Sequence, residues 1–188
     1  MKDELRKIHT YFSFHMRNCI AMIAASVTLL AYKMTNDEQQ IYDDVTEASF
    51  LLDLFDAGMG ICFDHTFGIE PIFFNDDYDV EAFVQHFLEQ CKNIMSEREI
   101  ELVLNINNSC VTKGNSHELR IIINLIVYEM ILKSGKSLSI SLNKNCLTLS
   151  ADTSFEEPLI WGTIKDVCKK RGISFIFSDK GCSLEFVV

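Results

Sequence analysis

The residues best suited to chemistry in this chain are His15 and two polar neighbours, Arg17 and Asn18. A neutral imidazole carries one unprotonated ring nitrogen, which can act as a nucleophile near pH 7. A guanidinium and an amide close by in the sequence could steady anionic oxygens. On a helix, positions two and three residues apart diverge by about 160° and 60°. Asn18 is therefore the better placed helper, and Arg17 is expected at the rim of a helix interface or against a partner. A single helical histidine is usually a polar surface residue, so the surrounding elements must decide.

The remaining composition excludes several other kinds of site. The net charge of −10 argues against nucleic-acid binding, which needs clustered Lys and Arg. The seven cysteines form no CxxC pair, so we expect no metal site, no disulfide framework and a reducing compartment. The charged start is unlike a signal peptide, and the apolar stretch 19–32 is too short to span a bilayer. We therefore expect a cytoplasmic protein without a membrane or nucleic-acid partner. The other four histidines are expected to be structural or incidental: His9, His65, His86 and His117.

Two heptad-patterned segments predict an antiparallel helical hairpin over residues 1–62. The first helix should span residues 3–34, and the second should begin after a cap at Thr35 or Asn36 and end near Gly58 and Gly60. The apolar positions of the two seams are Ile20, Ile23, Val27 and Leu30, and Ile41, Val45, Leu52 and Phe55. One hairpin cannot bury both seams, so we expect a homodimer in which two hairpins form a four-helix bundle.

Residues 63–188 have the sequence pattern of an α/β domain. The patterns predict a short strand at 71–74, a helix at 80–96, a strand at 101–106, a helix at 117–133, strands at 138–142 and 146–150, a helix at 159–171, and a closing hairpin of strands at 173–177 and 183–188. The predicted fold class is therefore α+β, with a dimerising hairpin followed by an α/β sandwich.

This order of elements resembles the transmitter region of sensor histidine kinases. Phe12–Asn18 resembles the phosphoacceptor box of that family, and His117–Ile126 resembles the opening of its nucleotide-binding helix. Tyr128 stands where such kinases carry an asparagine that binds magnesium. The segment Ala151–Pro158, where an Asp-x-Gly-x-Gly box should hold adenine, contains no glycine. The resemblance therefore implies a degenerate, histidine-kinase-type domain without a working ATP site.

A histidine-bearing hairpin followed by such a remnant is similar to the ChpT-like histidine phosphotransferases. The resemblance implies a phosphotransferase that is not an autonomous kinase, with His15 as phosphoacceptor and Arg17 and Asn18 as helpers. It implies no cofactor, because the partner receiver domain brings the magnesium. The expected partners are the receiver domain of a hybrid histidine kinase and a response regulator. Met16, where an acid is usual, and Ile20, where a proline is usual, depart from the family.

Two other interpretations remain open from the sequence. The chain could be a non-catalytic dimeric docking module that sequesters response regulators, or an atypical histidine kinase. Phosphorelay through His15 carries a structural expectation of its own, because an acceptor that meets receiver domains must be reached from solvent. We therefore expect His15 to face outward from the bundle.

Overall fold

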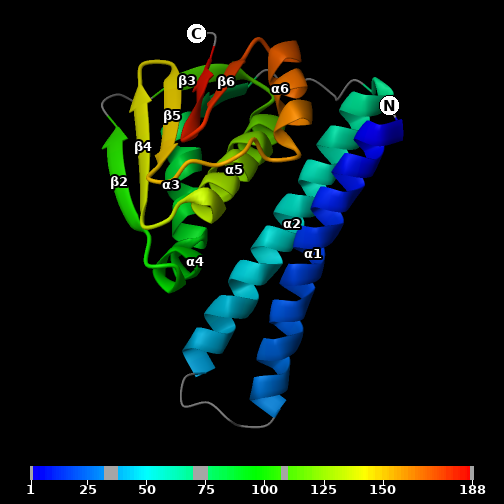
Figure 1. Cartoon of the computed structure of the whole chain (residues 1–188), viewed down its shortest axis with the longest axis vertical. Coiled ribbons are helices and arrows are strands. Elements are labelled where there is room, and N and C mark those ends of the chain that lie inside the picture. The colour runs from blue at the N-terminus through cyan, green and yellow to red at the C-terminus, as the bar shows by residue number, and fades with distance from the viewer. Residues whose placement is uncertain (1, 32–37, 70–75, 107–109, 187–188) are drawn as a thin grey trace.

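A pair of long antiparallel helices lies beside a mixed α/β domain in the computed structural model, which describes residues 2–31, 38–69, 76–106 and 110–186 (Figure 1). The two helices are α1 (Lys2–Ala31) and α2 (Glu38–Phe67). The end of the hairpin where α1 finishes and α2 begins extends beyond the α/β domain. The predicted α+β fold, a hairpin followed by an α/β domain, is confirmed.

The α/β domain is built on a five-stranded sheet with the order β2-β4-β5-β7-β6. Strands β2 and β4 are parallel, and the other neighbouring pairs are antiparallel. A separate two-stranded sheet pairs β1 with β3. The elements of this domain are β1 (Asp76–Asp79), α3 (Val80–Gln90), α4 (Lys92–Glu97), β2 (Glu101–Ile106), β3 (Val111–Gly114), α5 (Ser116–Lys133), β4 (Ser137–Asn143), β5 (Cys146–Ala151), α6 (Trp161–Lys170), β6 (Ser174–Ser178) and β7 (Gly181–Glu185).

Helix α5 is the central element of the molecule. Its N-cap is Asn115, whose side chain accepts a hydrogen bond from the Glu118 amide at 3.1 Å, and its C-cap is Ser134, so α5 lies within one residue of the predicted bounds. Every residue from 121 to 131 is buried. A helix buried all round needs partners on both sides. α5 contacts β5 of the sheet on one side and α2 of the hairpin on the other.

The predicted end of the second hairpin helix is wrong. α2 continues through Gly58 and Gly60 to Phe67, and Gly68 follows it with φ +71°. Helices commonly end at a glycine that adopts the left-handed conformation just after the last helical residue. Gly58 serves packing instead, because a Cβ at this position would lie 2.7 Å from a side-chain carbon of Leu125 on α5. The division of the chain between residues 62 and 63 falls within α2 and stays a prediction.

The α/β domain departs from the sequence prediction in two places. The helix expected over 80–96 is divided at Cys91 into α3 and α4. Asp76–Asp79 and Val111–Gly114, for which no strand was predicted, pair with each other. The strand expected at 71–74 and the cap at Thr35 or Asn36 lie outside the described residues.

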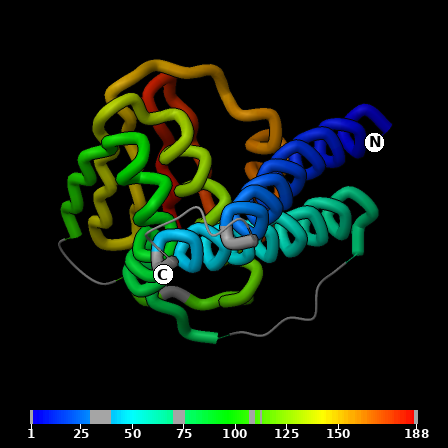
Figure 2. Tube along the Cα trace, turned by 90° about the horizontal axis from the view of Figure 1, so that it is seen from below, coloured from blue at the N-terminus to red at the C-terminus, as the bar shows by residue number. Residues whose placement is uncertain are grey.

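The two predicted seams have different surroundings in the single chain. Ile41 and Phe55 of α2 are buried within it. Ile20 and Val27 of α1 are 55% and 54% exposed. Figure 2 shows α1 and α2 side by side, so the apolar face of α1 that α2 does not cover is open to solvent in the single chain.

Candidate functional site

His15 lies at the junction of α1, α2 and α5, and only 8% of it is exposed. The expectation that it faces outward is therefore wrong for this arrangement. The side chain shares the inward face of α1 with Ile8, Phe12 and Cys19, all of which are buried. This face recurs every three or four residues, which is the spacing of one side of a helix.

Aromatic rings surround the imidazole of His15. The ring centroid of Tyr11, one turn earlier on α1, lies 4.5 Å away, and that of Phe55 on α2 lies 4.9 Å away. Tyr128 of α5 meets the imidazole edge-on at 5.7 Å. Tyr128 thus stands at the position of the expected magnesium ligand, but its ring packs against the hairpin.

An acid from α5 completes this cluster. Nε2 of His15 lies 3.6 Å from Oε1 of Glu129, and the Tyr11 hydroxyl donates a hydrogen bond to the same oxygen at 2.7 Å. Glu129 is 4% exposed, so its carboxyl group depends on these neighbours for polar contacts. The contact joins the hairpin to the α/β domain across 118 positions of sequence.

Burial disfavours the charged forms of His15 and Glu129. Removal from water lowers the pKa of His15 to about 4, with a smaller effect in the same direction from the positive charge of Lys133. Burial raises the pKa of Glu129, against the opposing effects of the Tyr11 hydrogen bond and Lys133. The imidazole is therefore unprotonated near pH 7, which is the form that can attack phosphorus.

The predicted helpers are not gathered around His15. Arg17 and Asn18 both lie on the exposed surface of α1, whereas the imidazole points into the junction. Phe14 is 61% exposed, but its ring also contacts His15, with the two ring centroids 5.3 Å apart. His9, one turn and a half earlier, is exposed as well.

Asp152 and Phe155, in the segment where an adenine-binding box was expected, have contacts within the α/β domain. The carboxylate of Asp152 accepts hydrogen bonds from the amides of Gly135 and Lys136 at 2.8 and 2.9 Å, and these lower its pKa. Beyond it, Phe155 packs edge-on against Trp161 with ring centroids 6.1 Å apart. Asn124 on α5 is buried, and its Oδ1 has no hydrogen-bond partner within the described part of the chain. The carboxylate of Asp152 thereby ties the segment after β5 to the residues that follow α5.

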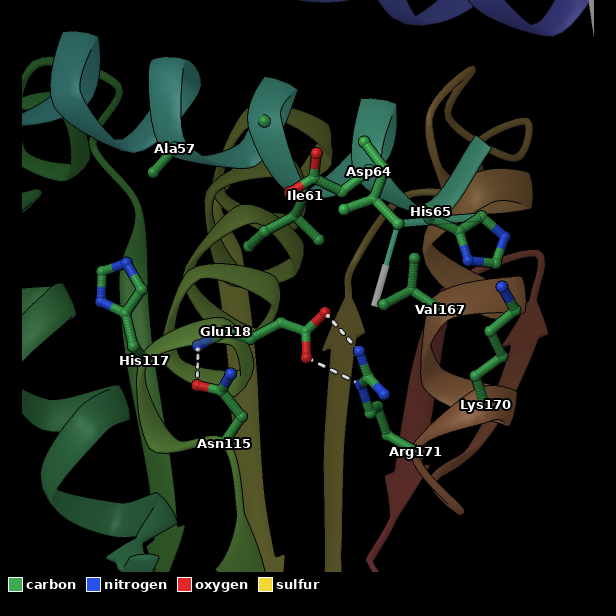
Figure 3. Close-up of a pocket in the computed structure, with 12 residues that line it drawn as sticks. Ala57, Ile61, Asp64, His65, Asn115, His117, Glu118, Val167, Lys170 and Arg171 are labelled. Atoms are coloured by element: carbon green, nitrogen blue, oxygen red, sulfur yellow. Dashed lines mark hydrogen bonds and ion pairs between the residues drawn. The ribbon is translucent and has the colours of Figure 1, made fainter. Parts of the chain in front are cut away.

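A cavity of about 250 Å³ opens where α2 meets the ends of α5 and α6 (Figure 3). Glu118 of α5 and Arg171, which follows α6, cross it as a two-bond ion pair at 2.7 and 3.2 Å. His65 and Lys170 line its far side. The ion pair fixes α6 against α5, and we assign this cavity to the contact between hairpin and domain.

The sequence analysis assigned no role to Glu129. The signal for a buried position was present, because Glu129 interrupts a run of apolar residues that continues on both sides of it. An acid within such a helix must find a polar partner inside the protein. The identity of that partner, Tyr11, depends on how the two parts pack and could not be read from spacing.

The described residues offer neither a cluster for a metal ion nor a membrane span. They contain no group of three or more His, Cys, Asp or Glu side chains arranged to hold a metal ion. Of the helices described, none has the length and apolar character needed to cross a bilayer.

Comparison with solved structures shows the same fold in several histidine kinases. The chain is similar to Acinetobacter baumannii histidine kinase AdeS, with a TM-score of 0.60, 9% identity and coverage of 90% of this chain and 95% of the other. Full-length ShkA in complex with AMPPNP matches with a TM-score of 0.52 and 11% identity, and the match covers 96% of this chain and 45% of that one. The cytoplasmic segment of histidine kinase QseC matches with a TM-score of 0.51 and 13% identity, and the match covers 60% of this chain and 78% of that one. No family model and no curated protein sequence matches the chain.

Proposed function

We propose that this chain is a histidine phosphotransferase, which carries a phosphoryl group on His15 between the receiver domain of a hybrid histidine kinase and a response regulator in the cytoplasm. One observation carries the proposal: a neutral imidazole lies on the first helix of a histidine-kinase-type hairpin, while Asp152, in the segment expected to hold adenine, is bonded to two backbone amides. In this proposal the chain has a phosphoacceptor but no working ATP site.

The transfer needs little from this protein besides the nucleophile. The lone pair of a ring nitrogen attacks the phosphorus of an aspartyl phosphate, and the phosphorus–oxygen bond to the aspartate breaks. The electron pair leaves with the carboxylate, and the product is a phosphoimidazolium that can then lose its ring proton. The receiver domain supplies the aspartate and the magnesium ion. Arg17 and Asn18, exposed on α1, are proposed to contact the receiver or the phosphate when it docks.

The decisive experiment is labelling by a phosphorylated receiver domain. We expect the label at His15, and we expect its loss in His15→Gln, which fills the site with a neutral polar side chain. Alanine is the poorer choice because it would leave a cavity among the surrounding rings. His9→Gln is the matched control, since His9 is exposed on the same helix. A label on His9, or full labelling of His15→Gln, would refute the proposal.

A second candidate function has its own supporting observation. With 8% of His15 exposed, the chain in this arrangement could bind response regulators without exchanging phosphate. A non-catalytic docking module would bind a receiver domain and remain unlabelled under every condition. Binding together with labelling would favour the phosphotransferase.

A further inference from the structure

The covering of His15 comes from a separate part of the fold. Tyr11, Phe14 and Phe55 belong to the hairpin, but Tyr128 and Glu129 belong to α5 of the α/β domain. A phosphoryl donor must bring phosphorus to within about 3.5 Å of the attacking nitrogen, in line with the bond that breaks. No receiver domain can reach a side chain that is this deeply buried. Transfer through His15 therefore requires α5 to move away from α1.

The geometry at Glu129 adds a second constraint. Only 3.6 Å separates Nε2 of His15 from Oε1 of Glu129. A phosphorus atom with its three oxygens does not fit in that gap. A phosphoryl group also carries a charge of about −1.5 to −2, and here it would be buried beside a carboxyl group that Tyr11 already holds in place. The closed arrangement and a phosphoryl group on Nε2 exclude each other.

We infer that α5 is a cover for His15, latched by the Tyr11–Glu129 hydrogen bond, and that phosphorylation of His15 holds the cover open. This inference rests on the proposed phosphotransfer. It gives the α/β domain a task that needs no nucleotide: the domain hides the acceptor when it is empty and separates from it when it is loaded. A response regulator would thereby meet two different surfaces before and after phosphorylation.

Tyr11→Phe tests the latch with the loss of a single oxygen atom. The ring stays, but Glu129 loses its hydrogen-bond donor in a buried site, so the closed arrangement should weaken by about tenfold in population. The readout is the rate at which diethyl pyrocarbonate acylates His15, followed by mass spectrometry, with exposed His9 as the internal reference. We expect His15 of the wild type to react far more slowly than His9 and to react about tenfold faster in Tyr11→Phe. Tyr42→Phe, on a tyrosine that is 67% exposed, is the matched control and should change nothing.

The wild-type protein tests the effect of phosphorylation. Phosphoramidate serves as a small donor: a ring nitrogen of His15 attacks its phosphorus, the phosphorus–nitrogen bond breaks and ammonia leaves. We expect hydroxyl-radical oxidation of Phe55 and Tyr128 to rise in the phosphorylated protein. Trp161, which is fully buried within the α/β domain, should stay protected. This measurement needs no variant and does not depend on how Tyr11→Phe folds.

The two proposals fail in different ways. If His15 of the wild type reacts as fast as His9, or if Phe55 and Tyr128 are equally protected in both forms, the cover is refuted while phosphotransfer stands. If His15 is protected in the wild type and freed in Tyr11→Phe but accepts no phosphoryl group from any donor, the proposed function is refuted. In that case the Tyr11–Glu129 hydrogen bond is a structural contact only, and its proposed coupling to phosphorylation is refuted together with the proposed function.

Discussion

His15 is held in the protonation state that a nucleophile needs, but in a place that a donor cannot reach. Both properties have the same cause, since the aromatic rings and the α5 side chains that exclude water from the imidazole also exclude a partner protein. A surface histidine would be open to partners but partly protonated near pH 6.5. At the scale of the residue, His15 can therefore react with a phosphoryl donor only while the α5 cover is open.

The lowered pKa of His15 predicts a loss of stability in acid. Above pH 6.5 the imidazole is neutral in the folded and the unfolded chain, so it contributes nothing to pH dependence. As the pH falls from 6.5 toward 4, the unfolded chain binds a proton that the folded chain refuses, and below about 4 both are protonated. The full shift corresponds to about 3 kcal/mol.

This loss can be measured by urea unfolding of the wild type and of His15→Gln between pH 7 and pH 4. The wild type should lose about 3 kcal/mol more than the variant over this range. His9→Gln should follow the wild type. Parallel pH profiles for the wild type and His15→Gln would show that the imidazole is not buried in solution.

At the scale of the element, two glycines of α2 have opposite roles although they lie only two positions apart. A Cβ on Gly58 would meet Leu125 at 2.7 Å and the ring of Phe12 at 3.1 Å, and both side chains are buried. A Cβ on Gly60 would meet nothing within 4 Å. Alanine gains about 1 kcal/mol over glycine inside a helix when no clash opposes it.

We therefore expect Gly60→Ala to raise the free energy of unfolding by about 0.5–1 kcal/mol. Gly58→Ala should lower it by about 1–2 kcal/mol, because overpacking outweighs the gain in helix propensity. Thermal or urea unfolding measures both. If the two variants were equally stabilised, α2 would not lie against α5 at Gly58.

The contacts of α5 and of the segment after β5 lead to a prediction about ATP binding. Tyr128 packs into the hairpin, and the carboxylate of Asp152 is held by two backbone amides. We expect no autophosphorylation and no saturable binding of ATP with magnesium in calorimetry. Micromolar binding would revive the interpretation as an atypical kinase.

Local patterns predicted most elements but not their partners. The limits of α5, the β4–β5 hairpin and the closing strands follow from apolar periodicity and caps, which are properties of neighbouring residues. The β1–β3 pair was missed because its strands are only four residues long. Gly58 was interpreted as a stop because close approach to Leu125 is a tertiary fact. The site could likewise be predicted only in part. The helix that carries His15 follows from local pattern, but the burial of His15 depends on contacts with α5, including Glu129, which is far away in sequence.

At the scale of the whole molecule, the exposed face of α1 calls for a partner. No charged residue occurs between Asn18 and Tyr32, and several large apolar side chains of this stretch are exposed: Ile20, Met22, Val27 and Leu29. This part of the hairpin extends beyond the α/β domain, so the domain does not cover it (Figure 1). Contiguous apolar surface on a helix typically marks an interface. A second copy would bury it in a four-helix bundle, in agreement with the heptad spacing of Ile20 and Val27.

Val27→Asp is the sharpest test of this proposed homodimer. Val27 is 54% exposed in the single chain, so the aspartate would remain solvated in a monomer but would be buried without a partner in the bundle. We expect the wild type to be a dimer in sedimentation equilibrium. The variant should be a folded monomer, with little change in its helical circular dichroism. Ser49→Asp, on the exposed polar side of α2, is the matched control and should stay dimeric. A folded wild-type monomer, or a Val27→Asp protein that dimerises as tightly as the control, would place the interface elsewhere or remove it.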